Sequence, residues 1–98
     1  MNITVKELLK LDKNSYQLID MRSDSERAYG TIPDAINLKA EEIAGNDKID
    51  SSKKLVICCS RGQFSIDVAE SLCEHGYDAV SLEDGYISWL LERFSNEE

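Results

Sequence analysis

The chain has 98 residues, enough for one compact domain and too few for two, so we expect a single domain over residues 1–98. Its polar end, residues 95–98, is expected to fray. With 11 basic and 19 acidic side chains, the formal net charge is -8. That charge opposes contact with phosphate backbones and anionic lipid surfaces, so we expect neither nucleic acid nor a membrane as a partner.

The apolar runs and the cysteines predict a cytoplasmic protein. The longest apolar run covers only residues 55–59, far short of the about 20 residues that a membrane-spanning helix needs, and no signal-peptide pattern opens the sequence. The 3 cysteines are an odd set that does not suit a disulfide framework, which indicates free thiols in a reducing compartment. With no Cys-x-x-Cys pair and His75 as the only histidine, we expect no metal site and no cofactor.

Helix and strand signals alternate along the first half of the chain. Thr4 with Glu7 has the spacing of a capping box, which predicts the start of a helix. Ser23 with Glu26 repeats that spacing, and Gly30 is placed to end the second helix as its C′ residue. Between and after these helices we expect a strand at 16–20, a turn and short strand within 32–38, and a brief helix at 40–44.

The second half continues the alternation. The uninterrupted apolar run 55–58 is typical of a strand covered on both faces, as in a parallel sheet. Ser65 is expected to open a helix that Gly76 ends, and a strand at 79–82 and a helix at 86–94 complete the chain. The faces expected to be buried are Ile66, Ala69, Leu72 and Cys73 in the first of these helices, and Ile87, Leu90, Leu91 and Phe94 in the second.

Strands that alternate with helices over short connections predict an α/β fold. We expect a small open parallel sheet of about five strands, with helices on both faces and right-handed crossovers. In open sheets of this kind, sites lie outside the carboxyl ends of the strands. The strand that ends at Cys59 meets its helix at Ser65, so the loop CSRGQF stands where a site is expected.

The thiol of Cys59 lies between a buried strand and a helix N-terminus. Backbone N–H groups and the helix dipole favour an anion there, the charge of Arg61 adds to them, and Gly62 permits the backbone to curl. We therefore expect the pKa of Cys59 to fall below its free value and the thiolate to be reactive. The alternative is that Cys59 is simply the last core residue of its strand.

Other residues near this loop are expected to be structural. Because side chains alternate along a strand, Cys58 should face away from Cys59. Trp89 is expected to pack in or beside the core, and Glu26 to serve its capping box. His75 stands at the far end of the helix from Ser65, too far to act as a base for Cys59.

Three blocks of sequence carry a family signature. The first block, LIDMRSDSERAYGTIPDAINL, contains Asp20 and Arg22 as a D-x-R pair and a turn that opens at Gly30. The second block, KLVICCSRGQFS, is a strand followed by a loop. The third block, HGYDAVSLEDGYISWL, places Gly85 and Trp89 at G-x-x-x-W positions. With these blocks in this order, nearly the whole chain resembles a single-domain rhodanese, a sulfurtransferase module. The resemblance implies the rhodanese-like fold described above.

The resemblance also implies a mechanism. Cys59 would be the family's persulfide-forming cysteine, which takes sulfane sulfur from a donor and passes it to a thiol or to cyanide. The donor would be thiosulfate or a persulfide of a protein or small molecule. Asp20 and Arg22 would help to organise the loop, or would form a structural ion pair. The backbone of the loop would hold the persulfide through residues Ser60, Arg61, Gly62, Gln63, Phe64 and Ser65.

The sequence departs from the family pattern at three positions. Thr31 stands where the family often has histidine, and Asp34 where it often has glycine, which affects turn detail. Phe64 stands where many members carry arginine, which leaves Arg61 as the only charged side chain of the loop and puts affinity for thiosulfate in question.

Two other functions are alternatives to sulfur transfer. Phosphatase or arsenate reductase chemistry needs C-x5-R, but the arginine position holds Ser65 counted from Cys59 and Phe64 counted from Cys58. A non-enzymatic docking or regulatory module, or a persulfide relay within a larger sulfur-trafficking system, is the second alternative. The charge of -8 favours a basic protein as partner, and the sequence carries no signal for an oligomeric state.

Overall fold

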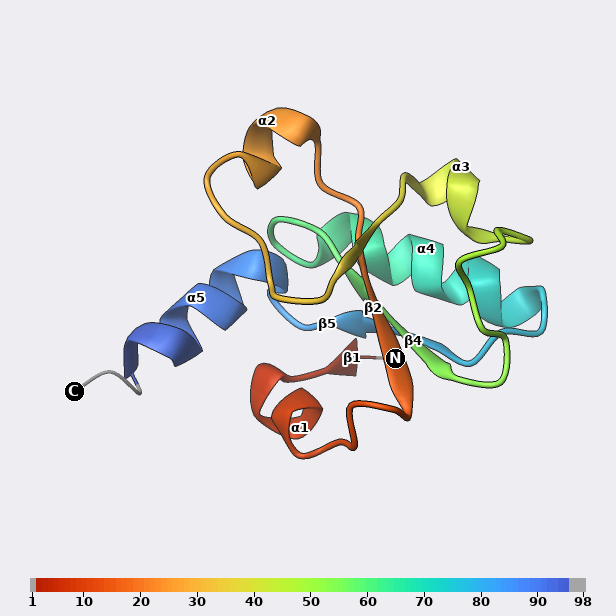
Figure 1. Cartoon of the computed structure of the whole chain (residues 1–98), viewed down its shortest axis with the longest axis horizontal. Helices are drawn as coiled ribbons and strands as arrows, with labels where there is room; N and C mark the ends of the chain where they lie inside the picture. The colour runs from red at the N-terminus through yellow and green to blue at the C-terminus, as the bar shows by residue number, and fades with distance from the viewer. Residues whose placement is uncertain (1, 96–98) are drawn as a thin grey trace.

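The computed structural model describes residues 2–95, which form an α/β arrangement around one parallel sheet (Figure 1). The five strands lie in the order β1-β5-β4-β2-β3, and all four pairings are parallel, which confirms the expected fold class. The strands are β1 (Asn2–Ile3), β2 (Tyr16–Asp20), β3 (Ile36–Asn37), β4 (Lys54–Cys58) and β5 (Ala79–Leu82).

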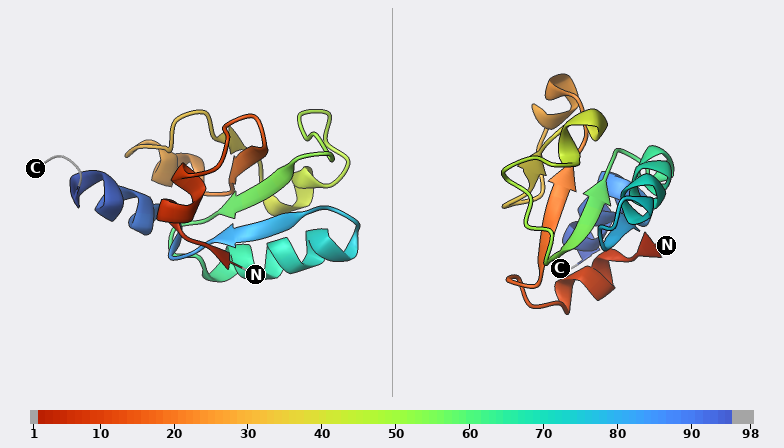
Figure 2. Two further views of the ribbon diagram at one scale, coloured as in Figure 1. Left: turned by 90° about the horizontal axis from the view of Figure 1, so that it is seen from below. Right: turned by 90° about the vertical axis from the view of Figure 1, so that its right-hand side faces the viewer.

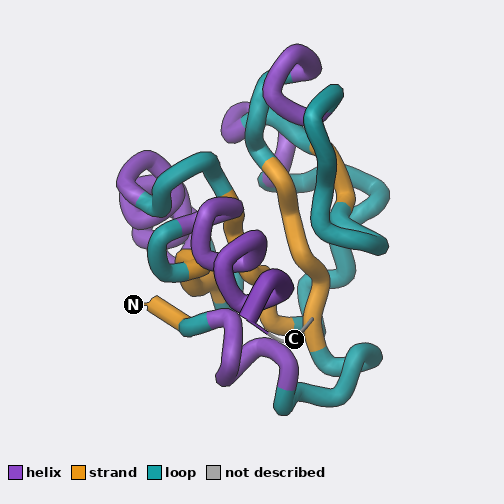
Figure 3. The backbone as a smooth tube through the Cα atoms, turned by 90° about the vertical axis from the view of Figure 1, so that its left-hand side faces the viewer, coloured by secondary structure: helices purple, strands orange, loops and turns teal. Residues whose placement is uncertain are grey.

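Helices cover both faces of this sheet. The helices are α1 (Val5–Leu9), α2 (Asp24–Arg27), α3 (Ala40–Ile43), α4 (Gln63–Glu74) and α5 (Gly85–Ser95). Helix α4 lies on one face and α1 on the other (Figure 2, left). Two core clusters result: one joins α1 and the start of α5 to the sheet, and the other joins α3 and α4 to it. The short helices α2 and α3 each follow a strand after a short connection and lead into a longer loop (Figure 3).

Both faces of strand β4 are buried, which explains why its sequence shows no alternation of apolar and polar residues. Leu55 and Ile57 belong to the cluster under α4, whereas Val56 and Cys58 belong to the cluster under α1 and α5. All four side chains are at most 1% exposed. Burial of an aliphatic side chain of this size stabilises the fold by about 1.5–3 kcal/mol, so a strand between two helical layers is apolar on both faces.

The register of the central strands brings two distant segments to one edge of the sheet. In the pairing of β2 with β4, Asp20 lies opposite Cys58. Both strands run in the same direction, so the residues after Asp20 and those after Cys58 leave the sheet at the same carboxyl edge. The loop that begins at Cys59 therefore lies beside the segment that leads to α2.

The ends of two helices differ from the sequence-based expectation. Helix α4 begins at Gln63 rather than Ser65, because Gly62 adopts a left-handed conformation with φ 85° and serves as its N-cap. Helix α2 ends at Arg27 with Ala28 as C-cap, so Gly30 lies one residue beyond the C′ position. Both expected capping boxes are present, at Thr4 and at Ser23. Of the tail expected to fray, residue 95 ends α5 and residues 96–98 lie outside the described residues.

The buried face of α5 was predicted correctly at Leu90 and wrongly at its other three residues. Ile87, Leu91 and Phe94 are 45%, 63% and 63% exposed, and the inward residues are Tyr86, Trp89 and Leu90. The helix is apolar on more than one side, so its periodicity does not fix its rotation. The rotation is set where the helix begins, because the backbone N–H of Tyr86 donates a hydrogen bond to the carbonyl of Cys59.

Two further features of the structure, strand β1 and the exposure of Cys73, were not predicted from the sequence. Strand β1 is only two residues long and pairs with β5 at Ser81 and Leu82, a contact between the first and the last strand of the sheet in chain order. Cys73 was expected on the buried face of α4, yet it is exposed, and its thiol donates to the carbonyl of Ala79 at 3.2 Å. Within residues 2–95, no helix has the length and apolarity needed to cross a membrane.

Candidate active site

Cys59 stands at the carboxyl edge of the sheet, at the floor of an open cavity. The side chain is half-buried, and the loop that it opens connects β4 to α4. The cavity has a volume of about 310 Å³, and its lining joins the β4–α4 loop to the segment after β2. It is lined by Met21, Arg22, Glu26, Cys59, Ser60, Arg61, Gln63 and Phe64.

The backbone of the loop is oriented by the start of α5. Tyr86 N–H donates to the carbonyl oxygen of Cys59 at 2.8 Å, and Ile87 N–H donates to that of Ser60 at 3.3 Å. These N–H groups belong to the first turn of α5, where helical donors lack partners within their own helix. With its carbonyl groups held toward α5, the loop turns the Gly62 N–H toward the sulfur of Cys59, at 3.1 Å.

Two glycines allow the loop and α5 to approach this closely. A Cβ on Gly62 would lie 2.8 Å from the backbone nitrogen of Asp84. A Cβ on Gly85 would overlap the carbonyl oxygen of Cys59 and lie 2.8 Å from the nitrogens of Arg61 and Gly62. Both glycines also have positive φ, 85° and 61°, which other residues adopt only at a cost. Gly85 was noted in the sequence only as part of a motif, and its contact with the loop was missed.

A pair of buried hydroxyls lies behind the sulfur. The thiol of Cys59 donates to Ser65 Oγ at 3.4 Å, and Ser65 Oγ lies 2.6 Å from Ser81 Oγ. Both serines are 0% exposed. When Cys59 is a thiolate, Ser65 is free to donate to the sulfur while Ser81 donates to Ser65. Ser81 lies on β5, 16 residues beyond Ser65, and no local sequence signal links the two.

The surroundings of Cys59 favour its thiolate. Burial by itself would raise the pKa of Cys59, but hydrogen bonds from the Ser65 hydroxyl and from the N–H groups of Ser65, Gly62 and Arg61 outweigh it and lower the pKa. The predicted direction is confirmed. The contribution of Arg61 comes from its backbone N–H and not, as expected from the sequence, from its charged side chain.

The neighbouring cysteine has the opposite chemistry. Burial, followed by the nearby carboxylate of Asp20, raises the pKa of Cys58 to about 12. Cys58 is 1% exposed and packs in the cluster under α1 and α5, away from the cavity of Cys59. The expectation that the two thiols face opposite sides of the strand is confirmed.

Asp20 and Arg22 form a buried ion pair that reaches toward the loop. Arg22 Nη2 lies 3.0 Å from Asp20 Oδ2 and donates to the carbonyl of Gly30 at 2.7 Å. The guanidinium also stacks over the ring of Tyr86, 3.7 Å from its centroid. The ion pair expected between Asp20 and Arg22 is present. Through Arg22 it contacts Tyr86, whose N–H donates to the carbonyl of Cys59, and a role of the pair in organising the loop stays a prediction.

Glu26 has a contact that its place in a capping box did not reveal. Its carboxylate accepts from the N–H and hydroxyl of Ser23, as expected, and also from the hydroxyl of Ser60 across the cavity. The Ser60 hydrogen bond, followed by those from Ser23, lowers the pKa of Glu26, so the carboxylate stays charged at neutral pH. The carboxylate of Glu26 and the side chain of Arg61 thus line the same cavity, and so does Phe64, which is 57% exposed.

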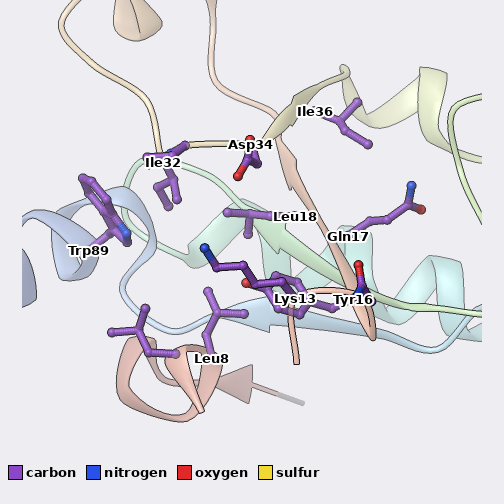
Figure 4. A pocket seen from close by; sticks show the side chains of 12 residues that line it. Leu8, Lys13, Tyr16, Gln17, Leu18, Ile32, Asp34, Ile36 and Trp89 are labelled. Atoms are coloured by element: carbon purple, nitrogen blue, oxygen red, sulfur yellow. The ribbon is translucent and has the colours of Figure 1, made fainter. Parts of the chain in front are cut away.

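The remaining candidates lie away from this chemistry. His75 is exposed at the end of α4, where Nδ1 contacts the carbonyl of Ser71. Among residues 2–95, no cluster of three His, Cys, Asp or Glu side chains is arranged to hold a metal ion. A larger cavity of about 520 Å³ lies between α1, β2 and α5 (Figure 4), lined largely by apolar side chains that include Leu8, Leu18 and Trp89, and its lining holds no cysteine.

The fold and the site agree with one protein family. The family model for the rhodanese-like domain matches residues 4–92. The chain therefore belongs to the rhodanese-like domain family. In this family pattern glycine often stands where this chain has Asp34, and Asp34 has a positive φ of 68°, a conformation that glycine adopts without strain.

Individual relatives cover most of the chain. YtwF of Bacillus subtilis is 35% identical over 86 residues, 87% of this chain and 82% of that protein. The thiosulfate sulfurtransferase GlpE of Shewanella oneidensis is 33% identical over 91 residues, 90% of each. The crystal structure of a rhodanese-like domain protein from Staphylococcus aureus matches with a TM-score of 0.78 and 34% identity over 90% of this chain and 89% of that one.

Proposed function

We propose that this rhodanese-type sulfurtransferase moves sulfane sulfur from a donor to an acceptor through a persulfide on Cys59. The observation that carries the proposal is the environment of the Cys59 sulfur. It is half-buried in an open cavity, 3.1 Å from the Gly62 N–H and 3.4 Å from the Ser65 hydroxyl, with a lowered pKa. A thiolate held in this way is a nucleophile that needs no neighbouring base.

The reaction has two displacement steps. In the first, the thiolate of Cys59 attacks the outer sulfur of thiosulfate or of a persulfide, and the donor leaves as sulfite or as a thiolate. In the second, an acceptor thiolate or cyanide attacks the outer sulfur of the Cys59 persulfide. The bond between the two sulfurs breaks, and its electron pair returns to Cys59 as a thiolate. Neither step needs an external oxidant or reductant.

The loop residues serve the persulfide through their backbone. The N–H groups of Arg61, Gly62 and Ser65 lower the pKa of Cys59, and the same donors would stabilise the negative charge of a persulfide and of the leaving thiolate. Ser60, Gln63 and Phe64 line the cavity through which a donor or acceptor would reach Cys59. Asp20 and Arg22 act as positioning residues, because they hold Tyr86 and through it the carbonyl of Cys59.

Mass spectrometry of the intact protein tests this proposal. The wild type is treated with thiosulfate and, separately, with a small-molecule persulfide, and is compared with Cys59→Ser and with Cys73→Ser, which removes another accessible thiol. We expect the gain of one sulfur atom, about 32 Da, in the wild type and in Cys73→Ser but not in Cys59→Ser. No gain with either donor, or an equal gain in Cys59→Ser, would contradict the proposal and favour a docking module.

A further inference from the structure

Large apolar side chains are exposed mainly beside the loop of Cys59. Residues 2–95 expose six of them, and four lie on α4 and α5. Phe64, in the first turn of α4, is 57% exposed, and Ile87, Leu91 and Phe94 on α5 are 45%, 63% and 63% exposed. The last three follow helical spacing and occupy one side of α5. Because both helices begin at the loop, this apolar surface starts at the candidate active site.

The apolar side of α5 lines a cavity that shares Arg61 with the cavity of Cys59. A second cavity, of about 440 Å³, is lined by Arg61, Asp84, Ile87, Ser88 and Leu91. Arg61 also lines the cavity that contains Cys59. The two cavities therefore adjoin at Arg61, with Cys59 in the lining of one and Leu91 in the lining of the other. We call the surface formed by Arg61, Phe64, Ile87 and Leu91 the α5 surface.

The charges around this surface do not suit a small dianion. The carboxylate of Glu26 lines the Cys59 cavity together with Arg61, and Asp84 lines the adjoining one. The guanidinium of Arg22 is paired with Asp20. A dianion in the cavity would meet one cation of the loop and one nearby anion, within a chain of net charge -8. An apolar surface with acidic neighbours fits a larger, basic partner better.

We propose that the α5 surface docks a polypeptide thiol, meaning a protein that presents a cysteine next to apolar and basic side chains and exchanges sulfane sulfur with Cys59. The inference rests on the proposed function and names its partner. In the transfer step, the partner's thiolate attacks the outer sulfur of the Cys59 persulfide, a new sulfur–sulfur bond forms on the partner, and Cys59 leaves as a thiolate. Docking on Ile87 and Leu91 raises the rate by holding the partner's sulfur near Cys59.

A second copy of this chain is a poorer occupant of the same surface. Two chains would each bring a charge of -8, and their repulsion opposes association. A basic partner gains from the same field, which also steers its approach. The proposal therefore predicts a rate that falls as salt is added, because salt screens the attraction between exposed charges.

A synthetic peptide with one cysteine flanked by leucine and lysine serves as the probe. The persulfide on Cys59 is formed, excess donor is removed, and the loss of sulfur to the peptide or to N-acetylcysteine is followed by mass spectrometry. We expect the peptide to react about tenfold faster than N-acetylcysteine at equal thiolate concentration. A matched peptide with glutamate in place of lysine should lose most of this advantage.

Two variants locate the effect. The rate of sulfur transfer to the leucine–lysine peptide, divided by the rate to N-acetylcysteine, should fall about fivefold in the double variant I87S/L91S and stay unchanged in Leu9→Ser. Leu9 is a suitable control because it is 61% exposed on α1, outside the lining of the Cys59 cavity and of the cavity beside α5. Equal rates for peptide and N-acetylcysteine, or an equal fall in Leu9→Ser, would overturn the proposal.

Binding of a peptide that cannot react separates docking from chemistry. The cysteine of the leucine–lysine peptide is alkylated, and its binding is measured by fluorescence anisotropy with wild type and I87S/L91S. Binding that weakens in I87S/L91S supports docking even if Cys59 fails to accept sulfur, in which case only the proposed transfer is refuted. Sulfur loading without detectable peptide binding refutes the docking proposal alone.

Discussion

The end of β4 and the start of the following loop carry the same side chain in opposite surroundings. Cys58 is paired within the sheet, is 1% exposed and has a pKa raised to about 12 by burial. Cys59, one residue later, is half-buried, and the N–H groups of the loop and the Ser65 hydroxyl lower its pKa. The difference shows what creates a reactive thiol here. Inside the sheet backbone N–H groups are used by neighbouring strands, whereas beyond its edge they are available to an anion.

Alkylation should separate the two thiols by the largest factor. At pH 8 a thiol of pKa about 12 is ionised to about one part in ten thousand, whereas Cys59, whose pKa is lowered from that of a free thiol, is ionised to a far larger fraction. We expect Cys59 to react with iodoacetamide about a thousandfold faster than Cys58, and its rate to rise with pH until its thiolate is fully formed. Peptide mapping over time measures both. Comparable rates would show that Cys58 is not protected by the core.

A methyl group added where α5 approaches the loop should strongly reduce sulfur transfer by Cys59. In Gly85→Ala the new methyl group overlaps the Cys59 carbonyl, so the loop or α5 must move. We expect sulfur transfer to fall about a hundredfold and the free energy of unfolding to fall by at least about 1–3 kcal/mol, the cost of a positive φ alone. Gly45→Ala is the matched control, because Gly45 has φ 74° and open space around its Cβ.

Urea unfolding and the rate of sulfur transfer are measured for both Gly85→Ala and Gly45→Ala. Gly45→Ala should lose about 1 kcal/mol of stability and keep its transfer rate. If Gly85→Ala kept that rate as well, the close approach of α5 to the loop would not matter for function.

The buried hydroxyl pair should have an intermediate effect. Ser65→Ala removes a donor to the thiolate and should raise the pKa of Cys59, seen as a midpoint shifted to higher pH in the pH dependence of alkylation. It also leaves Ser81 Oγ without its partner, at a cost of about 1–3 kcal/mol. The double variant S65A/S81A should recover part of that stability but not the pKa. An unchanged midpoint in Ser65→Ala would remove Ser65 from the account of reactivity.

The smallest effect is expected at the rim of the cavity, where two capping boxes can be compared. Glu26→Gln weakens a cap that also contacts Ser60, while Glu7→Gln weakens the cap of α1, which has no contact with the loop. We expect transfer to change only a fewfold in Glu26→Gln and not at all in Glu7→Gln. Both variants should melt at slightly lower temperature near neutral pH. The two carboxylates have lowered pKa values, so this loss should disappear as acid protonates them. Equal effects on transfer would show that the Ser60 contact is incidental.

The sequence by itself determined strands β2, β3, β4 and β5, most helix starts and the position of the loop. The apolar run 55–58, the two capping boxes and the alternation of elements are local patterns that report directly on burial and on backbone conformation. They sufficed to predict a parallel α/β sheet with Cys59 at its carboxyl edge. The direction of the pKa shift followed as well, because a loop at the start of a helix offers N–H donors to an anion.

Only the tertiary structure decided which distant residues complete the site. Gly85 and Tyr86 beneath the loop, Ser81 behind Ser65, and the link from Glu26 to Ser60 join segments that are far apart in the chain. The rotation of α5 was decided in the same way, by the hydrogen bonds from the N–H groups of Tyr86 and Ile87 to the loop. Such contacts depend on strand order, register and helix docking, and a local pattern of residues carries no information about which partner the fold will bring to it.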